Sequence, residues 1–221
     1  MAGRGALRPT RRATSQPTSR REEILVAATK LFREKGFSAV TVDEIGAAVG
    51  VTGPAIYRHF ASKEDVLVSV LNRAGDRISA EARSASRHAE SPRGALRLIV
   101  QQYLVEVIPH RRLVASYLQG TAFAADSETA APLRARQRKY LRHVGTVLRR
   151  ARPDLSSSEA QTLVHATFGV LNSVAWSELT IDKGAADLLE SAAMATLFSG
   201  AAASASHDGR SAKRPRIRAT A

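Results

Sequence analysis

The 221-residue sequence predicts an all-α protein of about nine helices, with a small tri-helical head at the N-terminus and a larger helical domain after it. Three features support this prediction. Apolar residues recur at intervals of three and four positions, which places them on one face of a helix. Ser, Thr or Asp stands where the predicted helices begin, and these residues cap free backbone N–H groups. No segment has the sustained alternation of apolar and polar residues that indicates a strand.

The first helix is expected over residues 20–35, with Ser19 or Thr18 as its cap and Gly36 as its end. Its apolar positions all fall on one helical face. The second helix begins at a capping box formed by Thr41 and Glu44 and runs to about residue 49.

A third helix is expected after Thr52 and a fourth after Ser62, each of these residues acting as a cap. The spacing of the caps gives the second and third helices about two turns each. Helices that short are not stable alone. The head must therefore pack around a shared core, predicted to be Phe32, Phe37, Ile45, Val49, Ile56 and Phe60.

The rest of the chain is predicted to be helical up to Gly200, where the last helix ends. Pro92 and Pro132 suit first helical turns, Ser156 and Glu159 form a second capping box, and Asp182 is a further cap. The expected helices are 63–87, 92–108, 110–123, 132–150, 157–179 and 183–199.

Composition excludes several classes of protein. The absence of Cys excludes disulfides and thiolate metal sites. No apolar run approaches the roughly 18 residues of a spanning helix, and the N-terminus lacks the apolar segment of a signal peptide. The six His residues form no HExxH motif, and neither a phosphate-binding Gly loop nor a nucleophile elbow is present. We expect a cytoplasmic protein that is not an enzyme, with no cofactor, metal site or membrane partner.

The net charge of +13 is concentrated in the two tails. Residues 1–21 carry six Arg and no acid, and residues 201–221 carry five basic residues and one acid. Basic tails of low complexity are typically disordered. They are either solubilising ends or segments attracted to a polyanion.

Three short stretches carry a resemblance to a known family. They are ILVAATKLFREKGF, TVDEIGAAVGV, and the segment Tyr57-Arg58-His59-Phe60 followed by Ser62-Lys63-Glu64. Together they resemble TetR-type transcriptional regulators. The resemblance implies a helix-turn-helix DNA-binding domain at 19–66 and a ligand-binding and dimerisation domain at 67–200. The flanks, 1–18 and 201–221, are then a disordered basic arm and tail.

The resemblance also implies DNA contacts. A recognition helix directs its N-terminal residues toward base edges, and here these residues are small. Phosphate contacts are implied for Tyr57, His59 and Lys63, and the Thr41 hydroxyl and Arg20 at the start of helix 1 are further candidates. The expected DNA-binding residues are Arg20, Thr41, Thr52, Gly53, Pro54, Ala55, Tyr57, Arg58, His59 and Lys63.

Three of these residues have a plainer alternative. Tyr57 would otherwise be a half-buried core aromatic, and His59 and Lys63 would simply be solvated. Pro54 and Ala55 depart from the family pattern, which often has Gly and a hydroxyl residue there, so the operator sequence stays open.

The second domain is expected to hold a small, uncharged or lipophilic ligand in a mostly apolar cavity. The candidate lining residues are Tyr103, Tyr117, Gln119, Phe123, His165, Phe168, Asn172 and Trp176, with Tyr140 as a further aromatic candidate. Each of them is alternatively a core residue, and polar His165 and Asn172 would alternatively bond across a dimer interface. The resemblance implies a homodimer that pairs through helices 157–179 and 183–199.

The sequence thus favours a ligand-responsive repressor that binds a pseudo-palindromic operator as a dimer. The alternative is a non-switching architectural protein that binds DNA through its basic tails. The operator, the effector and the regulated genes are not predicted.

Overall fold

The computed structural model describes residues 19–118, 128–176 and 180–200, and within these ranges it contains helices and connecting turns but no strand. The prediction of an all-α fold is confirmed. The helices are α1 (Arg20–Lys35), α2 (Val42–Ala48), α3 (Gly53–Ile56), α4 (Lys63–His88), α5 (Pro92–Val107), α6 (Arg111–Leu118), α7 (Ala131–Ala151), α8 (Ser157–Asn172) and α9 (Lys183–Leu197). Short 3₁₀ turns cover Ile108–His110, Glu128–Ala130 and Ser173–Trp176.

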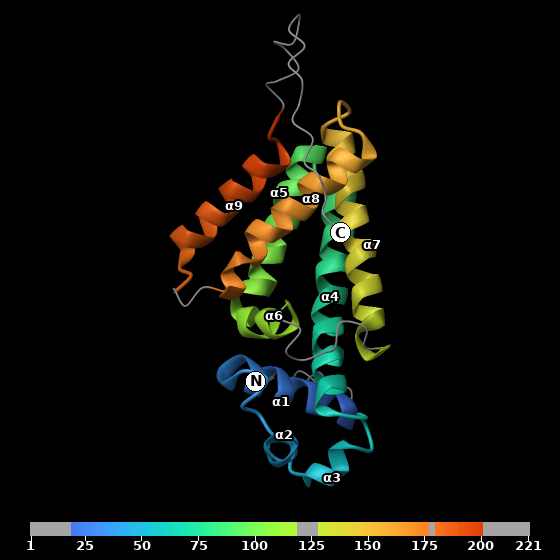
Figure 1. The fold of residues 1–221 in the computed structure, drawn as a ribbon, viewed down its shortest axis with the longest axis vertical. Helices are drawn as coiled ribbons and strands as arrows, with labels where there is room; N and C mark the ends of the chain where they lie inside the picture. The colour runs from blue at the N-terminus through green and yellow to red at the C-terminus, as the bar shows by residue number, and fades with distance from the viewer. Residues whose placement is uncertain (1–18, 119–127, 177–179, 201–221) are drawn as a thin grey trace, which may run out of the picture.

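The long helix α4 connects the two parts of the molecule (Figure 1). Its N-terminal end packs on α1, and α2 and α3 lie beyond α1 at the same end of the molecule. Its C-terminal half packs against α5 and α7, and α8 packs between α7 and α9. The helix therefore passes without interruption through residue 66, where the head was expected to end.

Most of the predicted helix caps are confirmed. Thr41 N–H donates to Glu44 Oε2 at 2.8 Å, and Glu44 N–H donates back to Thr41 Oγ1 at 3.1 Å. Ser156 and Glu159 form the same reciprocal pair at the start of α8. Each such cap contributes about 1 kcal/mol.

Helix α3 differs from the prediction. It is a single turn rather than two, and the Thr52 side chain makes no capping hydrogen bond. The reason is local, because Pro54 has no N–H to offer, and the Ala55 N–H donates to the Thr52 carbonyl at 2.9 Å.

Helix α8 ends earlier than predicted, at Asn172 instead of residue 179. A 3₁₀ turn follows it as far as Trp176, and the Ser173 hydroxyl donates to the Val170 carbonyl at 2.7 Å. Such a side-chain bond competes with the regular helical pattern. Residues 177–179 and the predicted end of the 110–123 helix lie outside the described residues.

Two separate hydrophobic cores are present. The core of the head contains the predicted Phe32, Phe37, Ile45, Ile56 and Phe60, and Val49 is partly buried beside it. Val66, Leu67 and Val70 of α4 and Leu113 of α6 complete this core. The second core joins α4, α5, α7, α8 and α9. Since Leu113 belongs to the second domain in sequence but to the head in packing, the two parts are joined by apolar contact as well as by α4.

Candidate nucleic-acid interface and internal cavity

Helices α2 and α3 are joined by a tight turn that only glycine permits at two positions. Gly50 has φ of +72°, in the left-handed region that favours glycine. A Cβ on Gly46 would lie 2.8 Å from the Val51 carbonyl oxygen, and the Val51 N–H donates to the Gly46 carbonyl at 2.9 Å. This close approach sets the angle between the two helices, which is the geometry of a helix-turn-helix.

The predicted DNA-contacting residues after this turn are mostly exposed together. Thr52, Pro54, Arg58 and His59 are exposed, Ala55 is half-buried and Gly53 is buried. Tyr57 is 56% exposed, so the alternative that it is a core aromatic is wrong. These residues lie on and directly after α3, at the end of the molecule farthest from α9 (Figure 1).

Lys63 is held more tightly than the sequence indicated. Its Nζ donates to the carbonyls of Phe37 and Val40 at 3.1 and 2.9 Å, and it lies 4.5 Å from the centre of the Phe37 ring. The alternative of a simply solvated Lys63 is therefore wrong. An ammonium group has three protons, so one remains for another acceptor.

The two arginines at the start of α1 are also engaged within the head. Arg20 Nη1 lies 2.6 Å from Glu23 Oε2 and 3.2 Å from the Val49 carbonyl oxygen. Arg21 Nη2 donates to Ser69 Oγ at 3.0 Å, and its guanidinium lies 4.6 Å from the centre of the Phe60 ring. Arg20 thus donates a hydrogen bond to a carbonyl at the C-terminal end of α2.

The Thr41 hydroxyl takes part in the capping box, and the carboxyl group of its partner, Glu44, has a strongly lowered pKa. A hydrogen bond from Lys35 Nζ at 2.6 Å, followed by one from the Thr41 N–H, lowers the pKa of Glu44 to about 2. The carboxylate is therefore ionised beside Thr41 at neutral pH.

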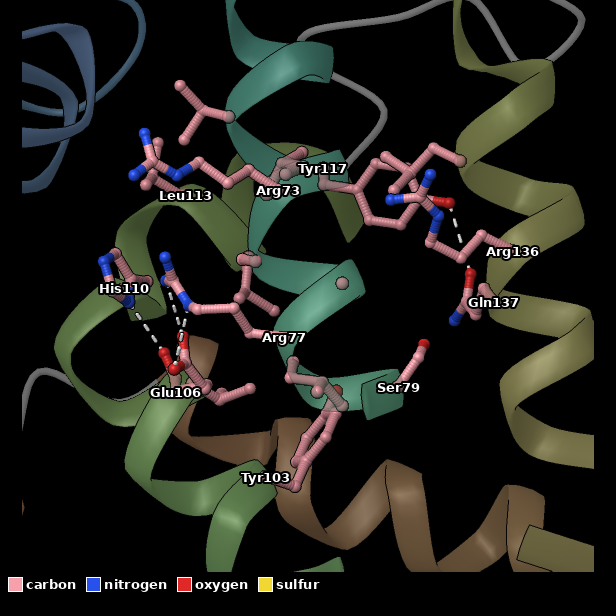
Figure 2. A pocket seen from close by; sticks show the side chains of 18 of the residues that line it. Arg73, Arg77, Ser79, Tyr103, Glu106, His110, Leu113, Tyr117, Arg136 and Gln137 are labelled. Carbon is pink, nitrogen blue, oxygen red and sulfur yellow. Dashed lines mark hydrogen bonds and ion pairs between the residues drawn. The ribbon is translucent and has the colours of Figure 1, made fainter. Parts of the chain in front are cut away.

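A cavity of about 330 Å³ lies where the head meets the second domain. Its wall comes from α1, α4, the end of α5, α6 and α7, with one residue of α8 (Figure 2). Apolar side chains form most of the wall: Val26, Val70, Leu71, Ala74, Ile78, Val107, Leu113, Val114, Leu118 and Leu133. The cavity is of the size of small-ligand sites.

Three arginines line this cavity, and each has a carboxylate partner. Arg77 forms a two-pronged ion pair with Glu106, at 3.2 Å from Nε and 2.9 Å from Nη2, and this contact raises the pKa of Arg77 (Figure 2). Arg136 pairs with Asp76 at 3.0 Å. Arg73 pairs with Glu22 of α1.

The predicted ligand residues divide into three groups. Tyr103, Tyr117 and Asn172 line the cavity, as does Tyr140. Phe168 is buried behind Tyr103 and Tyr140 and packs edge-on against both rings. His165 and Trp176 are exposed and do not line the cavity.

Two further predicted positions, Gln119 and Phe123, lie outside the described residues. The sequence reasoning missed the charged part of the wall, Arg73, Arg77, Glu106, His110 and Arg136. The spacing of Arg73 and Arg77, four residues apart on the long helix, would have placed both on one face.

Within the described residues, no helix is long and apolar enough to cross a membrane.

The fold agrees with comparisons to known proteins. A family model described as "Bacterial regulatory proteins, tetR family" matches residues 24–70. The transcriptional activator FasR of Mycolicibacterium smegmatis is 36% identical over 104 residues, which are 45% of this chain and 48% of FasR. The nucleoid occlusion factor SlmA of Marinobacter nauticus is 30% identical over 139 residues, 62% of this chain and 69% of SlmA. The chain belongs to the TetR family.

The TetR fold extends beyond the matched N-terminal segment. The solved structure of AibR in complex with isovaleryl coenzyme A and operator DNA has a TM-score of 0.64 to this chain at 20% identity. The superposition covers 80% of this chain and 97% of AibR. At that identity the likeness concerns the fold. The aligned part of this TetR chain spans about half the length of FasR.

Proposed function

We propose that this TetR-family chain is a ligand-responsive repressor, which binds a pseudo-palindromic operator as a homodimer and loses affinity when a small molecule fills the cavity. The observation that carries the proposal is that the cavity and the DNA-binding head share a wall. Val26 and Thr29 of α1 line the cavity, and the opposite face of α1 supports the core of the head.

Polar contacts couple α1 to the second domain around this wall. Arg73 of α4 pairs with Glu22, and Arg21 donates to Ser69 of α4. At the other end of α1, Arg112 Nη1 of α6 donates to the Glu34 carbonyl at 2.7 Å. A ligand that moves α4 or α6 therefore moves α1. DNA affinity falls to the extent that the ligand prefers the state with the wrong separation of the two heads.

The exposed residues after the α2–α3 turn are the proposed DNA-contacting surface. Tyr57 and His59 bind backbone phosphates, and Lys63 donates its remaining ammonium proton to a backbone phosphate. Arg58 is the longest donor available to a base edge, because Pro54 and Ala55 have no side-chain donors. These roles follow from the position of each residue in the family motif and from its exposure.

The proposed dimer interface is the outer face of α8 and α9. The exposed residues on this face are mostly small and uncharged: Thr162, His165, Ala166, Gly169, Leu188, Ala192 and Ala195. Leu188 is 72% exposed in the single chain. A face of this kind is suited to close packing against a second copy in a four-helix bundle.

Selection from random DNA with the full-length protein tests the DNA-binding part. We expect a pseudo-palindrome with half-sites about 34–36 Å apart or at a related spacing, bound by two chains. If random DNA competes as well as the selected site, the protein is instead the architectural alternative.

The dimer is tested by sedimentation of Leu188→Lys, which should be a folded monomer with weakened operator binding. Leu98→Lys is the matched control, since Leu98 is also exposed, at 41%, but lies on α5. A dimeric Leu188→Lys protein would contradict the proposed interface.

A further inference from the structure

Helix α7 carries a row of positive charge along one face. The helix contains seven basic residues and no acidic one, and no Asp or Glu occurs between residues 129 and 153. At 3.6 residues per turn, six of the basic residues fall within an arc of about 160° on the helix surface. They form what we call the α7 stripe: Arg134, Arg138, Lys139, Arg142, Arg149 and Arg150.

Most of the α7 stripe lacks a counter-charge. Four of its side chains are exposed and form no ion pair or hydrogen bond with any other described residue: Arg138, Lys139, Arg142 and Arg150. The acidic groups close to α7 are already engaged, since Asp154 pairs with Arg152 at 2.6 Å and Asp76 pairs with Arg136 at 3.0 Å. Like charges on one helix face repel one another. A bound polyanion would remove this repulsion.

The α7 stripe is separate from the DNA-binding head. Helix α7 lies on the side of the second domain away from α9 (Figure 1). His143, in the middle of the stripe, has its Nε2 2.9 Å from the Ser86 hydroxyl of α4. Ser86 is 23 residues along α4 from Lys63, a separation of about 35 Å. The stripe therefore offers a second charged surface at a distance from the first.

The composition of this face favours a nucleic acid over a membrane or a protein. No large apolar side chain is exposed on α7, all of which the structure describes. A helix on a membrane surface inserts apolar side chains, and a protein interface is centred on aromatic or aliphatic anchors. A phosphate backbone needs only cations. Five of the six stripe residues are Arg, which binds phosphate through two parallel hydrogen bonds.

Duplex DNA is the nucleic acid within reach of the α7 stripe. The head of a TetR-family chain binds DNA, so other segments of the same DNA molecule are present around the protein at a high effective concentration. The stripe runs 16 residues from Arg134 to Arg150, about 24 Å along the helix. This length corresponds to about seven base pairs of duplex.

We propose that the α7 stripe binds the phosphates of a second DNA duplex, without reading its sequence, while the head is bound to the first. A chain with two DNA-binding surfaces can bring two segments of one DNA molecule together. The inference goes beyond the proposed function, because it requires neither an effector nor a particular operator.

Fluorescence titration of the full-length protein with a random-sequence duplex of about 24 base pairs, longer than the stripe, tests the inference. Arg138→Gln/Arg142→Gln removes two cations of the stripe. We expect this variant to bind the duplex about tenfold more weakly. The slope of log affinity against log salt concentration should decrease by about 1.8, which corresponds to two phosphate contacts.

Arg93→Gln/Arg97→Gln is the matched control for the loss of charge. It removes two exposed cations, also four residues apart, from α5. The control should bind the duplex with the affinity and the salt dependence of the wild type. Because all four positions are exposed, both variants should melt at the wild-type temperature.

Protection of Lys139 gives a signal at the stripe itself. Acylation of this exposed amine by an N-hydroxysuccinimide ester, measured by mass spectrometry, should slow severalfold in excess duplex. Lys183, exposed on α9, should react at the same rate with and without DNA. The protection of Lys139 should persist in Arg58→Gln/His59→Gln, a variant that weakens the head.

Four outcomes would overturn the inference. The first three are an Arg138→Gln/Arg142→Gln protein that binds the duplex as the wild type does, an α5 control that weakens binding equally, and a Lys139 that stays reactive in excess duplex. The fourth uses phosphatidylglycerol vesicles: if these bind through Arg138 and Arg142 and the duplex does not, the stripe is a membrane surface. Since no operator or effector is needed, failure of the proposed function would leave these results unchanged.

Discussion

Arg77 and Glu106 join α4 to α5 across the side of the cavity, with both nitrogen–oxygen contacts at 3.2 Å or less. The pair keeps this part of the wall neutral. The side chains are 49% and 22% exposed, so the ion pair itself contributes about 1 kcal/mol or less to stability. The ion pair has a larger effect on the charge of the ligand that the cavity accepts than on the stability of the fold.

Glu106→Gln should change the charge preference of the cavity. Arg77 then lacks its carboxylate, and the affinity for 4-phenylbutanoate should rise by about tenfold, as expected for one charge-assisted hydrogen bond. Stability should fall by about 1 kcal/mol or less. Calorimetric titration measures the first effect and urea denaturation the second. The double variant Arg77→Gln/Glu106→Gln is the control, and it should lose the gain; an anion affinity that stays high in the double variant would contradict this explanation.

Lys63→Ala should affect both the fold and DNA binding. The side chain ties two carbonyls of the α1–α2 connection to α4, so its loss should lower the free energy of unfolding by about 1–3 kcal/mol. Operator affinity should fall similarly for all sequences. The slope of log affinity against log salt concentration should decrease by about one, which corresponds to the loss of one phosphate contact.

Binding titrations at several salt concentrations measure the slope for Lys63→Ala. Lys30→Ala, at an exposed position on α1, is the matched control for removing one charge from the head. A slope equal to that of the wild type would remove Lys63 from the proposed phosphate contacts while leaving its structural role intact.

Ala74→Leu should mimic a bound ligand. Ala74 lines the cavity, and the larger side chain fills part of it next to α1. Operator affinity should fall about fivefold or more, with no loss of thermal stability. Ala80→Leu makes the same change at an exposed position of α4 outside the cavity wall and should leave operator binding unchanged. Equal effects of the two substitutions would argue against coupling through the cavity.

Glu44 should make the head sensitive to acid. Its pKa is about 2 in the folded protein against an ordinary 4.5. A lowered folded-state pKa stabilises the fold above 4.5, and the stabilisation is lost as pH falls from about 4.5 to about 2. Thermal melts of the wild type should show this loss, and Glu44→Gln should reduce it. An NMR titration of the Glu44 carboxyl that gives a value near 4.5 would contradict the prediction.

The helical periodicity and the capping residues predicted most of the fold correctly, because both are local signals. The box at Thr41 and Glu44 depends on four consecutive residues and is present as expected. Thr52 also precedes a helix start, but Ala55 and not Glu or Gln stands three residues later, Pro54 has no N–H, and the Thr52 side chain makes no capping hydrogen bond. The length of α3 was therefore overestimated.

The cavity was harder to predict because its wall combines six helices that are distant in sequence. Tyr103 and Asn172 line the cavity, but His165 on the same helix as Asn172 is exposed. A polar residue in an apolar helix can face a cavity, a core or a partner subunit, and periodicity alone does not distinguish these cases. The paired arginines were missed because charged residues on a long helix ordinarily face solvent.

Because α4 is one continuous helix of 26 residues, it is about 39 Å long and acts as a lever between the cavity and the head. Ala74 lies 11 residues along the helix from Lys63, a separation of about 17 Å. A tilt of about 5° at Ala74 would move Lys63 by roughly 1.4 Å over that length. In a symmetric pair the two levers would swing in opposite senses and add their displacements. A small tilt of α4 would then change the separation of the two heads by roughly 3 Å.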